Sequence, residues 1–368
     1  MKIITPCLFG LEGLLADELR GLSALNVCVE NGRVLFEGDE NILARVNIFS
    51  RYAERVLILL GQFSAITFTE LFDGVKRLQI EDYIGRDDAF PVKGWSINSA
   101  LHSIPDCQSI IKKALVERLS LKYGIKWFSE TGPKYQIQFS ILKDEVSIML
   151  DTSGEGLHKR GYRAKSTTAP IKETLAAAMA YVAHVYPDST LYDPFCGSGT
   201  ILIESALLVN KIAPGLKRSF AAERFAFIPT KTWRDERMHA NDSIKRTKNL
   251  KLIGYDIDNT ALRLCEHNAK LAGVGGSLQL VNQDINKFDI MEERALVITN
   301  PPYGERLLEV KDAEKLYRIM GERFITKKGL RYYIISPHDD FEKIYGTTAR
   351  KRRKLYNGMI KCQMYMYF

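Results

Sequence analysis

A run of residues that could hold an aromatic amine ends an apolar stretch of the sequence, at VITNPPYGER (297–306). Asn300 offers an amide oxygen as a hydrogen-bond acceptor, and Pro301 has no N–H, so this segment leaves a backbone carbonyl free to accept as well. Two acceptors can hold both hydrogens of an aromatic NH₂ group and turn the nitrogen lone pair toward an electrophile. Tyr303 adds a ring on which a base can stack. The candidate catalytic residues are therefore Asn300, Pro301, Pro302 and Tyr303.

The alternatives for this run are a purely structural proline turn and chemistry at a ring carbon. A structural turn is disfavoured because the run stands at the end of an apolar strand pattern, where ligands bind in open α/β sheets. Chemistry at a pyrimidine carbon generally needs a thiolate that adds to the ring, and this strand end has no cysteine. The identity of the base stays open, because adenine, cytosine and guanine all carry an exocyclic amine.

A glycine-rich turn lies upstream, in LYDPFCGSGTILIE (191–204), where the pattern predicts a strand, a tight turn and a helix. Gly197 and Gly199 let the backbone approach a ligand without a clash from Cβ, and Thr200 can help to cap the helix. A dinucleotide fingerprint would have a third glycine at position 202, but that residue is leucine. The turn is therefore a poor match to an NAD site.

Acidic residues end the next two apolar runs. LIGYDID ends with Asp256 and Asp258, and QLVNQD ends with Asp284. A carboxylate at a strand tip can accept hydrogen bonds from both hydroxyls of a ribose, and Asp284 could accept one from an adenine amine. Asp256 follows Gly199 by far more than the usual ~20 residues, because a basic insertion at 211–249 separates them. Acidic strand ends around a glycine turn suit S-adenosylmethionine, which is cationic at sulfur and has no phosphates.

The elements that must position these residues form an α+β unit, a second α+β unit, a linker and an α/β domain, which we place at 1–60, 61–155, 156–169 and 170–368. In the last of these, apolar runs alternate with helical patterns, which predicts a Rossmann-like parallel sheet with helices on both faces. Residues 351–368 predict an antiparallel hairpin that turns at Asn357-Gly358. A parallel sheet that ends in such a hairpin is the arrangement of class I methyltransferases.

The first half of the chain shows helical patterns, and the whole chain is basic. Apolar spacing predicts helices at 11–25 and 41–60, and another between Asp106 and Gly124. The formal net charge is +8, which favours an acidic partner. Basic residues gather in three segments, which together indicate a polyanion; these are 155–172, 211–251 and the unbroken run Arg350–Lys354.

Several classes of protein are disfavoured by the sequence. No apolar run reaches the ~18 residues that span a bilayer, and the N-terminus has no cleavage signal, so we expect a cytoplasmic protein without membrane contact. The six cysteines and six histidines are scattered, and they predict neither a metal site nor a disulfide framework.

The sequence resembles the THUMP-containing class I methyltransferases over nearly its whole length, and most closely the bacterial large-subunit ribosomal RNA (guanine-N2)-methyltransferases. DPFCGSGT and NPPYGER resemble the two main motifs of that family, while FPVKGWSINSALHSIPDCQSIIKKALVERL and LDTSGEGLHKRGYR resemble its THUMP domain and the linker behind it. The resemblance implies a ferredoxin-like unit at 1–60 and a THUMP RNA-binding domain at 61–155. Some bacteria fuse this module to a second methyltransferase, but this chain matches the single-module form, so the second activity should be absent.

The resemblance also implies roles for individual residues. The target base would be held by Asn300, Pro301 and Tyr303, and S-adenosylmethionine by Asp193, Phe195, Gly197, Gly199, Thr200, Asp256, Ile257 and Asp284, with Lys172 and Glu173 on the cofactor side. We predict RNA contacts from Lys112, Lys113, Lys159, Arg160 and Arg163. The implied product is N2-methylguanine in 23S ribosomal RNA. The alternatives are a transfer-RNA guanine-N2 methyltransferase, an adenine-N6 methyltransferase acting on DNA or RNA, and a non-catalytic RNA-binding protein.

Overall fold

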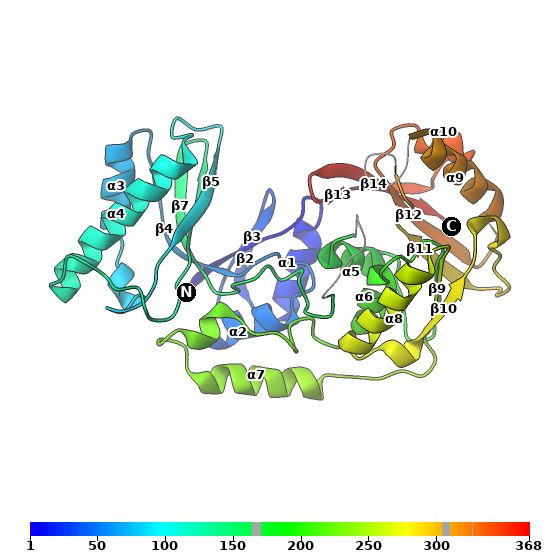
Figure 1. Ribbon diagram of the computed structural model, residues 1–368, viewed down its shortest axis with the longest axis horizontal. Coiled ribbons are helices and arrows are strands. Elements are labelled where there is room, and N and C mark those ends of the chain that lie inside the picture. Colours follow the sequence, from blue (N-terminus) through cyan, green and yellow to red (C-terminus); the bar gives the residue numbers. More distant parts are fainter. Residues whose placement is uncertain (164–170, 304–309, 326) are drawn as a thin grey trace.

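The structure, a computed structural model, describes residues 1–163, 171–303, 310–325 and 327–368. Within these residues the strands form two seven-stranded sheets, one from each half of the chain. Figure 1 shows the two sheets along the long axis of the molecule, with the N-terminal strands in blue and cyan and the C-terminal hairpin in red. Of the predicted linker, residues 164–169 lie outside the described residues.

The first sheet joins the strands of both predicted α+β units. Its strands are β1 Lys2–Pro6, β2 Leu25–Glu30, β3 Arg33–Glu37, β4 Leu57–Ser64, β5 Val92–Ile97, β6 Ile137–Leu142 and β7 Glu145–Asp151. They lie in the order β2-β3-β1-β4-β7-β6-β5. Strand β4 pairs with β1 at its start and with β7 along its length, so both units share it. The boundary expected after residue 60 therefore falls within β4.

The helices of this half are α1 Glu12–Gly21, α2 Glu40–Phe49, α3 Phe68–Lys76 and α4 Ile104–Tyr123, with a 3₁₀ turn, η1, at Ile80–Asp82. The prediction of a helix between Asp106 and Gly124 is confirmed, and Gly124 ends α4 in the left-handed conformation. The prediction of a helix over 41–60 is wrong beyond Phe49. The apolar segment that follows α2 forms β4 instead, since a short apolar run fits a buried strand as well as a helix.

The second sheet is parallel except for its last two strands. Its strands are β8 Thr190–Asp193, β9 Lys251–Asp256, β10 Leu278–Asn282, β11 Ala295–Thr299, β12 Leu330–Ser336, β13 Lys351–Asn357 and β14 Ile360–Tyr367. They lie in the order β10-β9-β8-β11-β12-β14-β13, in which β14 is antiparallel to both of its neighbours. The predicted Rossmann-like sheet with a terminal hairpin is confirmed.

Helices cover both faces of this sheet. On one face, α5 Glu173–Val182, α6 Thr200–Val209 and α8 Asn259–Ala272 pack on a core that includes Tyr333 and Ile335. On the other face, α9 Val310–Arg323 and α10 Phe341–Tyr345 pack on Tyr332 and Ile334, since successive residues of a strand face opposite sides. The remaining elements are α7 Thr230–Asp242, η2 Ala221–Arg224, η3 Gly275–Ser277 and η4 Ile285–Lys287. No helix in the described ranges is long and apolar enough to cross a bilayer.

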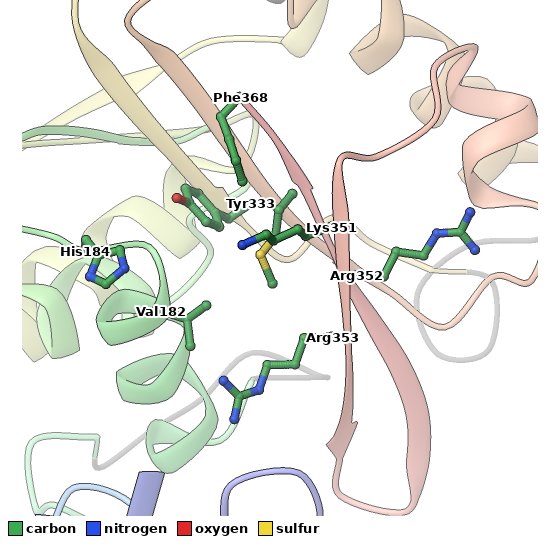
Figure 2. A pocket seen from close by; sticks show the side chains of 8 residues that line it. Val182, His184, Tyr333, Lys351, Arg352, Arg353 and Phe368 are labelled. Carbon is green, nitrogen blue, oxygen red and sulfur yellow. The ribbon is translucent and has the colours of Figure 1, made fainter. Parts of the chain in front are cut away.

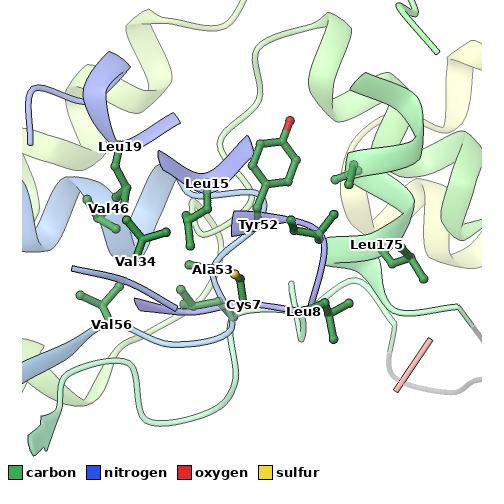
Figure 3. Close-up of a cluster of buried hydrophobic side chains, with 14 of the residues drawn as sticks. Cys7, Leu8, Leu15, Leu19, Val34, Val46, Tyr52, Ala53, Val56 and Leu175 are labelled. Atoms are coloured by element: carbon green, nitrogen blue, oxygen red, sulfur yellow. The ribbon is translucent and has the colours of Figure 1, made fainter. Parts of the chain in front are cut away.

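The two halves share a buried junction. Figure 3 shows apolar side chains of the first sheet and its helices in one cluster with Leu175 of α5. Helix α7, inside the basic insertion, packs on α2, where Arg45 donates to both carboxylate oxygens of Glu236 at 2.9 and 2.7 Å. Arg237 of α7 pairs with Glu223 and donates to two backbone carbonyls. The insertion thus contributes an acidic residue to the junction, and part of its positive charge is paired within the insertion instead of facing solvent.

Candidate cofactor and base site

A cavity of about 790 Å³ opens at the carboxyl ends of β8, β9, β10 and β11, which is the edge where ligands bind in open α/β sheets. The glycine turn, the two acidic strand ends and the candidate catalytic run all reach it. The predicted residues around this cavity are Asp193, Phe195, Gly197, Thr200, Asp256, Ile257, Asp284, Asn300, Pro301, Pro302 and Tyr303. Residues 304–306 of the predicted run lie outside the described residues.

The glycine turn is held by the end of the neighbouring strand. Gly197 and Gly199 have φ values of +51° and +81°, a region that favours glycine, and a Cβ on Gly199 would clash with Sγ of Cys265. The Gly197 N–H donates to Oδ2 of Asp256 at 3.0 Å, while Oδ1 accepts from the N–H of Asp258 at 2.9 Å. Asp256 thereby fixes the turn against β9, and its oxygens keep lone pairs for ribose hydroxyls.

Asp193, at the end of β8, is a buried carboxyl with an exposed fraction of 1%. Its Oδ1 accepts from Oγ1 of Thr299 at 2.7 Å and from the N–H of Phe195 at 3.2 Å. Burial raises the pKa of Asp193 to about 7; the two hydrogen bonds lower it, and the charge of Asp256 raises it. A buried carboxylate next to a second one favours a cation in the cavity that both line.

The candidate catalytic run presents an acceptor and a fixed ring. Oδ1 of Asn300 is buried and has no hydrogen-bond partner among the described residues, although buried polar atoms usually have one. Because Asn300 lines the cavity, this oxygen is placed to accept an N–H from a bound base. Tyr303 also lines the cavity, and its hydroxyl accepts from Nδ2 of Asn357 at 2.7 Å. The ring is therefore held in place before a base arrives.

Two more predicted residues offer contacts for an adenine. Ile257, at the rim of the cavity, is 69% exposed, and an exposed apolar side chain gains free energy when it covers a flat ring. Oδ1 of Asp284 accepts from the N–H and the side-chain amide of Asn286, both at 2.7 Å. These hydrogen bonds lower the pKa of Asp284, so it remains an ionised acceptor at neutral pH.

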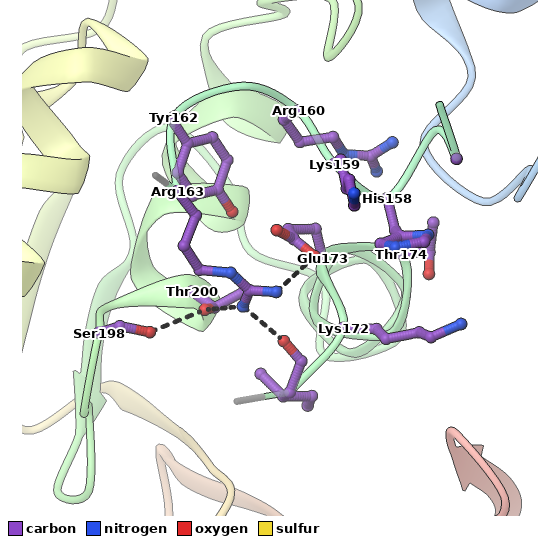
Figure 4. Close-up of polar contacts among 12 residues, drawn as sticks. His158, Lys159, Arg160, Tyr162, Arg163, Lys172, Glu173, Thr174, Ser198 and Thr200 are labelled. Atoms are coloured by element: carbon purple, nitrogen blue, oxygen red, sulfur yellow. Dashed lines mark hydrogen bonds and ion pairs between the residues drawn. The ribbon is translucent and has the colours of Figure 1, made fainter. Parts of the chain in front are cut away.

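Lys172 and Glu173 do not line the cavity, contrary to the cofactor-side roles that were predicted for them. Nζ of Lys172 pairs with Glu54 at 3.0 Å, and the buried Glu173 pairs with Arg163 at 3.0 Å. Figure 4 shows Arg163 also donating to Oγ1 of Thr200, at 3.2 Å. Ion pairs thus hold both side chains, and Arg163 links Glu173 to Thr200 in the cavity wall.

Most of the cations predicted to contact RNA have partners inside the protein. Arg160 is 4% exposed and donates to backbone carbonyls. Lys112 lies over the ring of Phe90 and pairs with Glu130, and Arg163 is bound as described above. The structure contradicts a direct RNA contact for Arg160 and leaves Lys112 and Arg163 poorly placed for one, because their charged groups are already paired. The two that remain exposed are Lys113 and Lys159.

One wall of the cavity was not predicted from the sequence. One face of α9 lines it, through Asp312, Lys315, Leu316 and Ile319. Their spacing of three, four and seven residues indicates one helix face, but spacing alone does not distinguish a face on a cavity from a face on a core. Thr299 was also missed, since only the fold brings it to Asp193. In the described part of the chain, no three His, Cys, Asp or Glu side chains are grouped as metal ligands.

The fold and this cavity define a class I methyltransferase. Family models match the chain in three consecutive parts: the RlmL ferredoxin-like domain at 2–57, the THUMP domain at 65–151 and the RMKL-like methyltransferase domain at 160–366. The chain belongs to the RMKL-like methyltransferase family, and the predicted THUMP-containing family is confirmed.

Curated relatives and solved structures agree with this assignment. The putative RNA methyltransferase YpsC of Bacillus subtilis is 41% identical over 368 residues, which cover 100% of this chain and 95% of that protein. The ribosomal RNA large subunit methyltransferase K/L of Syntrophotalea carbinolica is 34% identical over 96% of this chain, which spans only 52% of that relative. A possible methylase from Clostridium difficile 630 has a TM-score of 0.95 at 41% identity, covering 100% and 97% of the two chains. SMU.472, a putative methyltransferase complexed with SAH, has a TM-score of 0.94 at 38% identity, with the same coverage.

Proposed function

We propose that this protein is an S-adenosylmethionine-dependent RNA methyltransferase that methylates N2 of guanine in large-subunit ribosomal RNA. The observation that carries the proposal is the oxygen of Asn300, which has no partner among the described residues and lines the same cavity as the glycine turn and Asp256. An acceptor without a partner at this strand end fits an amine substrate, and the acidic strand ends fit a cationic nucleoside.

The residues around the cavity fit the cofactor. Asp256 offers its carboxylate to ribose hydroxyls, Ile257 and Asp284 flank the place for an adenine, and Asp193 offers negative charge to a cationic group. S-adenosylmethionine supplies an electrophilic methyl group on a positively charged sulfur. The similar structure SMU.472 is complexed with SAH, which supports a cofactor of this kind.

The side chains of the catalytic run position the base. Oδ1 of Asn300 holds one N–H of the amine and stabilises the positive charge that grows on nitrogen. The Tyr303 ring, fixed through Asn357, gives the base a surface on which to stack. Catalysis then rests on positioning and charge stabilisation, and the proton leaves to water once the amine carries a positive charge.

The choice of substrate rests on the family more than on the cavity. The THUMP match and the large-subunit names of the K/L relatives support ribosomal RNA. The choice of guanine as the target base rests on the family resemblance, since an amine-binding motif does not distinguish one base from another. Guanine N2 of transfer RNA and N6 of adenine remain competitors, and a 42% identical structure from Listeria monocytogenes is described as a predicted N6-adenine-specific DNA methylase.

Nucleoside mass spectrometry on separated RNA pools, from cells with and without the gene, tests the proposal. We expect N2-methylguanine to disappear from large ribosomal RNA alone. Its loss from transfer RNA would support guanine-N2 methylation but reject ribosomal RNA as the substrate. Loss of N6-methyladenine would reject guanine as the target base. Unchanged nucleosides in every pool would favour a non-catalytic RNA-binding protein.

A further inference from the structure

A second cavity, of about 570 Å³, lies between the C-terminal end of α5 and the hairpin of β13 and β14. Figure 2 shows His184, just beyond the end of α5, on one side of this space and Lys351, Arg352 and Arg353 of β13 on the other. The described residues that line it include these three cations and no Asp or Glu side chain. The three cations belong to the unbroken basic run of the sequence, which the cofactor cavity does not use.

The cavity has a flat apolar floor. In the register of the sheet, Lys351 pairs with Met366, and Met366 pairs with Tyr333. The three side chains therefore form a row across three strands, on the sheet face that also carries α5. Because β13 is the edge strand of the sheet, the charged end of this row lies where a long ligand can pass without entering the protein.

The three cations differ in how many hydrogen bonds and ion pairs their charged groups already make within the protein. Arg352 pairs with Glu342, and Figure 2 shows it directed away from the cavity. Arg353 uses one terminal nitrogen to donate to the carbonyl of Gly10 at 2.9 Å, which leaves its other N–H groups available. Lys351 is exposed and has no hydrogen bond or ion pair with any described residue. The free positive charge is thus that of Lys351, with Arg353 beside it.

We propose that this cavity binds a backbone phosphate of the RNA substrate, with Lys351 and Arg353 as its ligands. The inference rests on the proposed function, because the RNA is the one that is methylated. The bond from Arg353 to Gly10 places the site where the methyltransferase domain meets the N-terminal unit, and Figure 1 shows β13 beside that unit. The proposal requires that an RNA in contact with both the THUMP unit and the cofactor cavity pass this junction. Lysine and arginine contacts to phosphate add affinity and fix the register of the RNA without reading its bases.

Charge reversal at the free lysine tests the proposal, with a matched reversal on the other face of the sheet as control. Lys351→Glu is compared with Lys343→Glu, since Lys343 is an exposed lysine on α10 that lies away from the cavity. The probe is deproteinised 23S ribosomal RNA from cells without the gene, in filter binding over a range of salt concentrations. We expect Lys351→Glu to weaken binding roughly tenfold at physiological salt and to reduce the salt slope by about one. Lys343→Glu should change neither by more than about twofold.

Calorimetry of S-adenosylmethionine binding accompanies both variants, because unchanged cofactor affinity shows that each is folded. Equal RNA affinity in the two variants would overturn the proposal. Binding of millimolar inorganic phosphate that depends on Lys351, together with an RNA affinity that does not, would assign the cavity to a small free anion and would also overturn it. The two proposals fail differently. RNA affinity that depends on Lys351, without any methyl transfer, contradicts only the proposed function.

Discussion

The hydroxyl of Tyr303 accepts a hydrogen bond of 2.7 Å from Nδ2 of Asn357. Asn357 is the last residue of β13, immediately before the Gly358 turn, and it is 3% exposed. The terminal hairpin of the sheet therefore fixes the ring that is proposed to hold the target base. The hairpin was expected only as a feature of the fold, and the structure gives it a part in the site.

Breaking this hydrogen bond should slow methyl transfer without weakening cofactor binding. In Asn357→Ala this hydrogen bond to the Tyr303 hydroxyl is lost, so we expect kcat/KM on RNA to fall roughly tenfold, about 1.4 kcal/mol. Tyr303→Phe removes the other half of the same bond. The double variant should therefore lose little more than the larger single loss. Fully additive losses in steady-state kinetics would show that the two residues act separately.

Asn300→Ala should affect turnover most strongly. The substitution removes an acceptor that acts as charge develops on the amine, so we expect the rate of methyl transfer to fall by ~10²-fold or more. Asn300→Asp keeps an acceptor and should retain more activity. Single-turnover assays measure the rate, and calorimetry measures cofactor affinity, which should barely change. Lost cofactor binding with surviving turnover would contradict the role assigned to Asn300.

Substitutions of Asp256 should act on the cofactor. Asp256→Ala removes the acceptor for the Gly197 N–H as well as the one proposed for ribose hydroxyls. We expect affinity for S-adenosylmethionine to fall roughly ten- to a hundredfold, which corresponds to ~1.5–3 kcal/mol. Asp256→Asn keeps an acceptor for Gly197 but loses the charge, so its loss should be smaller. Calorimetry with NAD provides the control, and tight NAD binding by the wild-type protein would refute the interpretation of the glycine turn.

Asp193 should make the stability of the cofactor-free protein depend on pH. Its pKa is about 7 in the fold and ~3.9 in an unfolded chain. Between these values the folded protein keeps a proton that the unfolded chain has released. This carboxyl therefore lowers the free energy of unfolding as pH rises from about 4 to about 7. Asp193→Asn does not titrate, so its thermal midpoint relative to wild type should increase between pH 5 and pH 8. A constant difference in midpoint would contradict the raised pKa.

Much of the candidate site could be predicted because parallel strands bring their carboxyl ends to one edge. Asp193, Asp256 and Asn300 are far apart in the sequence, yet each follows an apolar run, and the structure places all three around one cavity. The α9 wall could not be predicted in the same way, since its helical spacing is also that of a helix on a core.

Other features depend on partners that a sequence pattern does not show. Arg160 looks like a surface cation in a basic segment, but it is buried and donates to the backbone carbonyl of Arg51, in another part of the chain, as well as to that of nearby Leu157. The apolar run after Phe49 fits a helix by composition, and only its pairing with β1 and β7 makes it a strand. For the same reason, the union of two expected units in one sheet was not foreseen.

The sharing of β4 between the two N-terminal parts has a consequence for target choice. The THUMP unit is not a separate domain on a flexible linker, because its strands belong to the same sheet as those of the N-terminal unit that packs on α5. That unit is also tied to the cofactor domain through Glu54, which accepts from Thr174 at 2.8 Å and from Lys172 at 3.0 Å. These connections therefore hold the THUMP unit at a fixed distance from the cofactor cavity. If the THUMP unit binds the RNA substrate, a nucleotide reaches the cavity only when the shape of the RNA places it at the matching distance from that unit.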